Sequence, residues 1–186
     1  ISVNPACPRI GIDNADRESP LTAPNFCMLL RKHLLSATVD GVSLVGFDRI
    51  VRIDFSASSE FFDAGKRTLF VELMGRYSNI ILTENGKVSG GNRGVNFFDN
   101  GVRPLIVGRD YALPPSGDKK EPSDKSLIEY FARYQSDGEK LSDYLVKGVR
   151  GISSDTAAEA VSEYYKTRPQ FNAAEFYAFI NDFAYR

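Results

Sequence analysis

The chain has 186 residues, of which 42% are hydrophobic and 25% are charged, and this is the composition of an ordinary globular protein. Its 23 Lys and Arg residues against 24 Asp and Glu residues give a formal net charge of -1, which argues against a histone-like or polybasic protein but leaves room for a local basic patch. The two cysteines, Cys7 and Cys27, are too few for a disulfide framework and lack metal-ligand spacing, so we expect no metal and no cofactor.

The first predicted helix follows a polar, turn-forming segment. Pro24 stands where helices accept proline, near the first turn. The apolar spacing after it predicts a helix from Asn25 that is buried on most of its circumference. Arg31 and Lys32 must leave this helix on its exposed side, near the C-terminal end, where cations also suit the helix dipole.

A β region follows this helix. Residues 42–56 contain an alternating strand, residues 68–74 a more continuously apolar one, and residues 79–84 another. A short strand at 86–91 is reached through Glu84-Asn85-Gly86, a hairpin-turn sequence. Successive strands joined by short turns indicate an antiparallel meander. The alternation places Ile50, Arg52 and Asp54 on one face and Val51, Ile53 and Phe55 on the other.

The second half of the chain changes character. Residues 92–110 are rich in Asn, Gly and Arg, and we expect them to be irregular. The Pro- and Lys-containing stretch that follows marks a domain boundary, so we expect an α+β domain at 1–115, a linker at 116–124 and a helical domain at 125–186. Four segments of the helical domain show helical spacing: 125–135, 139–149, 154–166 and 173–185.

Residues 149–161, "VRGISSDTAAEAV", have the layout of a helix-hairpin-helix element. In such elements the backbone N–H groups of the hairpin and of the following helix N-terminus can hold a phosphate. Gly151 and Ser153 are therefore candidates for a phosphate-binding hairpin. Ser153 stands where a second glycine is usual, and a tight interhelical turn without a ligand is the alternative.

Five motifs stand out along the chain: "NPACPRIGID", "PNFCMLLRKHL", "GFDRIV", "VELMGRYSNIIL" and "VGRDYALPP". In their order and spacing they resemble the NFACT-N domain of the FbpA/RqcH family of ribosome quality control proteins, some of which carry an older fibronectin-binding label. The resemblance implies an α+β fold in which an antiparallel sheet domain like the N-terminal domain of formamidopyrimidine-DNA glycosylase precedes an all-helical, helix-hairpin-helix-like domain. We expect the family's extreme N-terminus, coiled coil and C-terminal RNA-binding domain to lie outside this chain.

The resemblance implies a non-catalytic module that binds tRNA and the large ribosomal subunit with its rRNA, and that supports C-terminal tailing of stalled nascent chains in the cytoplasm. The Asp-Arg pair that supports tRNA binding in the family falls on Asp48 and Arg49. Arg93, Arg103 and Arg109 could extend a basic face. The residues expected to bind RNA are Asp48, Arg49, Arg31, Lys32, Arg76 and Asn79.

Plainer interpretations of these residues stay open. Asp48 and Arg49 could form a strand-entry ion pair that contributes little to stability. Arg31 and Lys32 could be a solvated helix end, and Asn79 could simply support its turn.

Two other functions also stay open. One is a cell-surface adhesin that binds fibronectin, and the other is a DNA glycosylase-like nucleic-acid-binding protein. Glycosylases of that fold use an N-terminal proline and a cysteine zinc finger, whereas this chain starts at Ile1 and holds two cysteines. With His33 as the single histidine, no nucleophile–base arrangement stands out, so we expect no enzyme. No apolar run reaches the ~18 residues of a membrane helix, so we expect no membrane partner.

Overall fold

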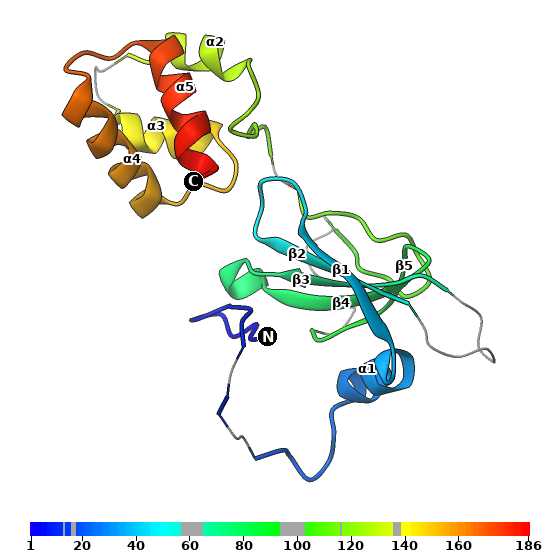
Figure 1. Cartoon of the computed structure of the whole chain (residues 1–186). Helices are drawn as coiled ribbons and strands as arrows, with labels where there is room; N and C mark the ends of the chain where they lie inside the picture. Colours follow the sequence, from blue (N-terminus) through cyan, green and yellow to red (C-terminus); the bar gives the residue numbers. More distant parts are fainter. Residues whose placement is uncertain (13, 16–17, 57–64, 94–102, 116, 136–138) are drawn as a thin grey trace. The chain divides into compact units, whose positions relative to one another are not determined.

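The computed structural model of the chain consists of two compact units (Figure 1). Unit 1 comprises Ile1–Val45 and Arg49–Pro115, and unit 2 comprises Gly46–Asp48 and Ser116–Arg186. Residues 116–124, expected as a linker, are thus part of unit 2, and so is a three-residue piece of the sheet region. The structure describes residues 1–12, 14–15, 18–56, 65–93, 103–115, 117–135 and 139–186.

Unit 1 is built on a five-stranded antiparallel sheet with the strand order β1-β2-β3-β4-β5 (Figure 1). With its helix, this meander confirms the expected α+β class. The β4–β5 hairpin turns through Asn85 and Gly86, whose φ angles of 51° and 80° are those of the predicted two-residue turn. The strands are β1 (Thr38–Leu44), β2 (Ile50–Ser56), β3 (Arg67–Glu72), β4 (Asn79–Glu84) and β5 (Lys87–Gly91).

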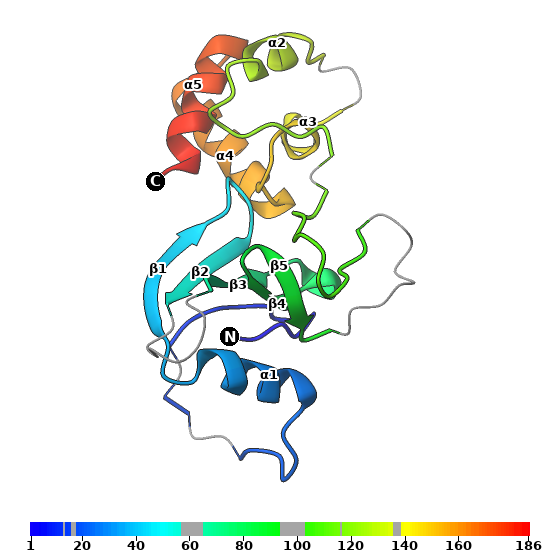
Figure 2. The same ribbon diagram turned by 90° about the vertical axis from the view of Figure 1, so that its right-hand side faces the viewer.

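One face of the sheet packs against the helix α1 (Asn25–Leu34), which Figure 2 shows lying on one side of the strands. The predicted alternation of β2 is confirmed, because Val51, Ile53 and Phe55 all belong to the apolar cluster under α1. The central strand β3 is buried on both faces along nearly its whole length, which explains its continuous apolar sequence.

Helix α1 itself is less buried than its sequence predicts. None of its residues is fully buried, and Met28 is 51% exposed. Only one stripe faces the sheet, at the helical spacing of Phe26, Leu29, Leu30 and Leu34. The prediction of burial around most of the circumference is therefore wrong for this chain.

The two edges of the sheet differ. The β5 edge is covered by residues 106–111, since the Gly108 N–H donates to the Val88 carbonyl (2.8 Å) and the Tyr111 N–H to the Gly86 carbonyl (2.9 Å). All seven residues of β1 are exposed, and among the described residues only β2 pairs with it. A bulge between Val39 and Gly41 interrupts this pairing.

Unit 2 has a helical core of large aromatic and aliphatic side chains, and its four helices confirm the four predicted segments. Ser153 and Asn172 cap α4 and α5, and their side-chain oxygens accept hydrogen bonds from first-turn N–H groups at 3.0–3.2 Å. None of the helices in the described part of the chain is long and apolar enough to cross a membrane. The helices are α2 (Leu127–Ala132), α3 (Leu141–Gly148), α4 (Ser154–Thr167) and α5 (Ala173–Ala184).

Candidate nucleic-acid interface

Three of the predicted RNA-binding residues, Arg49, Arg76 and Asn79, lie at the same end of the sheet. Ile50 pairs with Glu72, and Glu72 pairs with Asn79, so the start of β2, the end of β3 and the start of β4 lie side by side. We call this the Glu72 end of the sheet. Arg49 directly precedes β2, and Arg76 lies in the 3-10 turn η1 (Gly75–Tyr77) that connects β3 to β4. Both side chains are exposed there.

Arg31 and Lys32 lie elsewhere in unit 1. They are exposed in the last turn of α1, which leads through residues 35–37 into Thr38. Thr38 pairs with Ser56, at the opposite end of the sheet. Because a six-residue strand spans roughly 17 Å, the structure does not bring this pair into one cluster with the residues of the Glu72 end.

Asp48 and Arg49 fall in different units. Asp48 is half-buried and belongs to unit 2. In the same segment the Phe47 N–H donates to Glu121 Oε1 (3.4 Å), and the Phe47 ring meets the Tyr185 ring edge-on at 5.4 Å. Arg49 belongs to unit 1, where its carbonyl accepts from the Leu73 N–H (2.9 Å), fixing its backbone to the end of β3.

The Asn79 side chain, at the first residue of β4, is buried and hydrogen-bonded. It is 7% exposed, and its side-chain Oδ1 accepts from the N–H groups of Arg93 and Ile80, both at 2.9 Å. Ser78 is fully buried, and its hydroxyl accepts from the Met74 N–H at 2.9 Å. The Asn79 side chain thus joins the start of β4 to the segment after β5, and RNA binding by Asn79 stays a prediction, whereas the neighbouring Arg76 is exposed.

Beside Arg76 the turn presents an aromatic residue that sequence reasoning missed. Tyr77 is 62% exposed, and the Arg76 guanidinium carbon lies 4.7 Å from its ring centroid. The Arg93 guanidinium donates to the Arg76 carbonyl. The available signal was an aromatic residue in a glycine-led turn between two strands, a place where binding residues often collect.

Another arginine at the Glu72 end, Arg103, is largely buried in an ion pair. Arg103 donates to both carboxylate oxygens of Glu72, at 2.7 and 3.0 Å, and Tyr111 donates its hydroxyl to the same carboxylate at 2.8 Å. The Tyr111 ring stacks on Phe70 at 3.9 Å. Burial, with the nearby Glu72 charge, raises the pKa of Tyr111. Arg103 therefore holds the chain around residue 103 against β3. Because Glu72 neutralises its charge, Arg103 does not contribute to a basic face.

The α3–α4 hairpin has the contacts of a tight interhelical turn. Gly151 has φ +75°, and a Cβ at this position would lie 2.7 Å from Phe47 atoms. Ser153 Oγ accepts from the Thr156 N–H, one of the donors that a phosphate at the α4 N-terminus would use. Phosphate binding by Gly151 and Ser153 stays a prediction.

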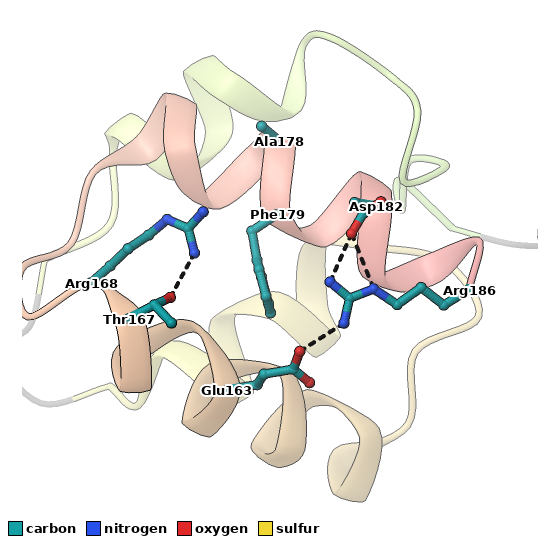
Figure 3. Close-up of a pocket in the computed structure, with 7 residues that line it drawn as sticks. All are labelled: Glu163, Thr167, Arg168, Ala178, Phe179, Asp182 and Arg186. Atoms are coloured by element: carbon teal, nitrogen blue, oxygen red, sulfur yellow. Dashed lines mark hydrogen bonds and ion pairs between the residues drawn. The ribbon is translucent and has the colours of Figure 1, made fainter.

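Unit 2 also contains a groove of about 650 Å³ between α4 and α5 (Figure 3). Figure 3 shows Phe179 between Arg168 on one side and Arg186 on the other. Arg186 is already paired with Asp182 and Glu163, each at 2.7 Å. The charges along the groove thus cancel locally. In the described part of the chain, no group of three or more His, Cys, Asp or Glu residues could hold a metal ion.

The chain is an α+β protein that combines a sheet unit with a helical unit. The family model of the NFACT N-terminal and middle domains matches residues 1–183, so the chain is a member of this family, as the five motifs predict.

The individual relatives carry the name RqcH. The chain is 34% identical over 163 residues to the Rqc2 homolog RqcH of Bacillus subtilis, and 31% identical over 164 residues to that of Streptococcus pneumoniae. These matches cover 87% and 86% of this chain but only 29% of each relative, so the chain spans less than a third of these curated relatives.

Solved structures from two streptococci are similar over nearly the whole chain. The N-terminal part of the fibronectin/fibrinogen-binding protein of Streptococcus suis superposes with a TM-score of 0.77 at 29% identity, covering 97% of this chain and 66% of that one. The N-terminal domain of the fibronectin-binding protein PavA of Streptococcus pneumoniae gives a TM-score of 0.74 at 32% identity, covering 91% and 65%.

Proposed function

We propose that this chain is a non-catalytic RNA-binding module of a cytoplasmic ribosome quality control factor. It binds tRNA and the rRNA of the large ribosomal subunit, and so supports C-terminal tailing of stalled nascent chains. Membership of the NFACT family and the RqcH relatives support this proposal. Within it, unit 1 is the glycosylase-like sheet domain and unit 2 the helix-hairpin-helix-like domain.

The observation that carries the proposal is the pair of arginines at the Glu72 end of the sheet. Arg49 stands at the position of the family's Asp-Arg pair, and Arg76 stands in the neighbouring turn, with both side chains exposed. A guanidinium presents a planar fork of donors that suits phosphate oxygens and can also stack on bases. A net charge of -1 is compatible with this function, because phosphate contacts depend on local charge.

The test is tRNA binding by the 186-residue chain and by the double variant Asp48→Ala/Arg49→Ala, at two salt concentrations. We expect the variant to bind at least ~10-fold more weakly at low salt, with a salt dependence reduced by roughly one phosphate contact. The matched control is Asp182→Ala/Arg186→Ala, which removes an exposed acid–arginine pair at the C-terminal end of α5 and just beyond it. Equal binding by the two double variants, both folded by circular dichroism, would count against the proposed site.

Fibronectin binding is a second candidate, favoured by the names of the streptococcal structures that superpose on this chain. Surface plasmon resonance on immobilised fibronectin tests it with the same proteins. Saturable binding that Asp48→Ala/Arg49→Ala retains would separate this activity from RNA binding. Loss of both activities in that variant would place them on one surface.

A further inference from the structure

Backbone and side-chain hydrogen bonds hold the turn η1, while its Arg76 and Tyr77 side chains are exposed to solvent. The Tyr77 N–H donates to the Met74 carbonyl and the Ser78 N–H to the Gly75 carbonyl, both at 3.0 Å, and Gly75 supplies the positive φ of +54° that the turn requires. The buried Ser78 hydroxyl links the two ends of the turn by accepting from the Met74 N–H, and the next residue, Asn79, accepts from the Arg93 N–H. The turn is therefore pre-organised, so binding through it loses little conformational freedom.

Two guanidinium groups are anchored on this turn. Arg76 lies over one face of the Tyr77 ring, and Arg93 donates to the carbonyl of Arg76. Tyr77 is 62% exposed, so the rest of its ring is open to solvent. Within the described part of the chain, neither Arg76 nor Arg93 forms an ion pair with a carboxylate.

The same sheet end shows what an arginine–tyrosine pair looks like when its role is structural. Arg103 lies 5.0 Å from the ring centroid of Tyr111, a geometry close to that of Arg76 and Tyr77. There the charge is neutralised by Glu72, whose side chain is 3% exposed, and the other ring face is covered by Phe70. Among the residues that the structure describes, no carboxylate pairs with Arg76, and the Tyr77 ring is 62% exposed.

We propose that η1 is a stacking site for one unpaired nucleobase of RNA, in which the Tyr77 ring stacks on the base while Arg76 and Arg93 contact the phosphates beside it. This inference rests on the proposed RNA-binding function and names the element of RNA that the Glu72 end takes. Every base has a π-face, so stacking on an aromatic ring tolerates any sequence. A base can reach the ring only where it is unpaired, as in a loop or a single strand. The site thus selects exposed bases over continuous duplex.

The absence of tryptophan from the sequence provides a direct test. In Tyr77→Trp, the new indole keeps the stacking surface and is the only tryptophan of the chain, so its fluorescence reports contact with a base. The probes are hexauridylate, hexaadenylate and an abasic ribose-phosphate hexamer. We expect both base-containing hexamers to quench the fluorescence and the abasic one to leave it unchanged. The control is Tyr165→Trp, on the 40% exposed Tyr165 of α4, which we expect to be unaffected by all three.

Affinity measurements with the same hexamers complete the test. Tyr77→Ala should weaken binding of hexauridylate by about 10-fold, the size of a lost base–aromatic stack, whereas Tyr77→Phe should stay within about two-fold of the wild type. Arg76→Gln and Arg93→Gln should each reduce the salt slope by roughly 1.

The outcomes separate this inference from the function on which it rests. Suppose that the wild type binds tRNA and that Tyr77→Ala binds both tRNA and hexauridylate as tightly as the wild type does. The stacking site is then overturned, and the RNA-binding function stands. An unquenched Tyr77→Trp that still binds hexauridylate has the same meaning. A wild type that binds neither RNA at low salt overturns both.

Discussion

The two arginine–tyrosine pairs at the Glu72 end of the sheet have similar geometry and opposite surroundings. Arg103 and Tyr111 converge on the buried carboxylate of Glu72, whereas Arg76 and Tyr77 stand in solvent on a glycine-led turn. The first arrangement satisfies its charges within the chain, so it can only hold the fold together. The second leaves the guanidinium N–H donors of Arg76 and one face of the Tyr77 ring available to a ligand. Arginine content alone therefore does not define a basic surface, because each guanidinium must first be checked for an internal carboxylate.

The largest expected effect comes from breaking the buried pair. Glu72→Gln leaves the Arg103 charge buried beside a neutral amide, and we expect it to lower the free energy of unfolding by about 3–5 kcal/mol. Urea denaturation of the chain measures this loss.

Two further variants control this measurement. Asp110→Asn breaks the exposed Lys87–Asp110 pair, whose side chains are 58% and 87% exposed, and should cost less than about 1 kcal/mol. Adding Arg103→Met to Glu72→Gln removes the stranded charge and should recover part of the stability. A loss no larger than that of Asp110→Asn would show that the buried pair does not fasten its segment.

A smaller effect distinguishes the two tyrosines. Tyr111→Phe keeps the ring on Phe70 but removes the hydroxyl that donates to Glu72, and should lower the free energy of unfolding by about 1–2 kcal/mol. Tyr77→Phe should change it by less than about 0.5 kcal/mol, because that side chain is exposed. Equal values for the two variants would contradict the assignment of separate structural and binding roles.

The same hydroxyl gives a pH dependence with a defined sign. Burial, together with the Glu72 charge, raises the pKa of Tyr111 in the folded chain above its ordinary value of 10.0. Above pH 10 the unfolded chain loses this proton while the folded chain keeps it, so stability falls as the pH rises, by about 1.4 kcal/mol per pH unit. Unfolding free energies at several pH values above 10 measure the slope, which Tyr111→Phe should reduce by that amount. An unchanged slope would mean that Tyr111 is no more buried than an ordinary surface tyrosine.

The smallest effect on stability is expected for Arg76→Ala. Its guanidinium contacts the exposed Tyr77 ring, so its removal should cost less than about 0.5 kcal/mol while still weakening RNA binding. Thermal unfolding followed by circular dichroism checks the first part. A loss of stability comparable to that of Tyr111→Phe would make the exposed pair structural as well.

Local patterns predicted most of the secondary structure. The alternation around Ile53, the Asn85-Gly86 turn and the helical spacing of the second half depend on residues close in sequence, and all three are confirmed. The pairing of Glu72 with Arg103 joins residues 31 positions apart and has no local pattern. For this reason Arg103 could be counted toward a basic face from composition but not recognised as neutralised.

The candidate site was predicted only in part, for a similar reason. The motifs pointed to Arg49 and Arg76, but the exposure of a side chain depends on which neighbours cover it. The Asn79 side chain is buried and accepts a hydrogen bond from the N–H of Arg93, a residue beyond β5, whereas Tyr77 is 62% exposed. Periodicity also cannot say how many sides of α1 are covered, and so it overestimated the burial of that helix.

The bulge in β1 has a consequence for how the protein behaves when many copies are crowded together. An uncovered edge strand is a template on which further strands can grow into a continuous fibril-like ladder. In β1 the extra residue Asp40 sits between Val39 and Gly41, which divides the edge into one stretch of two residues and another of four. Neither stretch is as long as the six- or seven-residue segments that nucleate such ladders, and a charge stands at the break. We expect this one-residue irregularity to disfavour self-templated strand addition at β1, which among the described residues pairs with β2 alone.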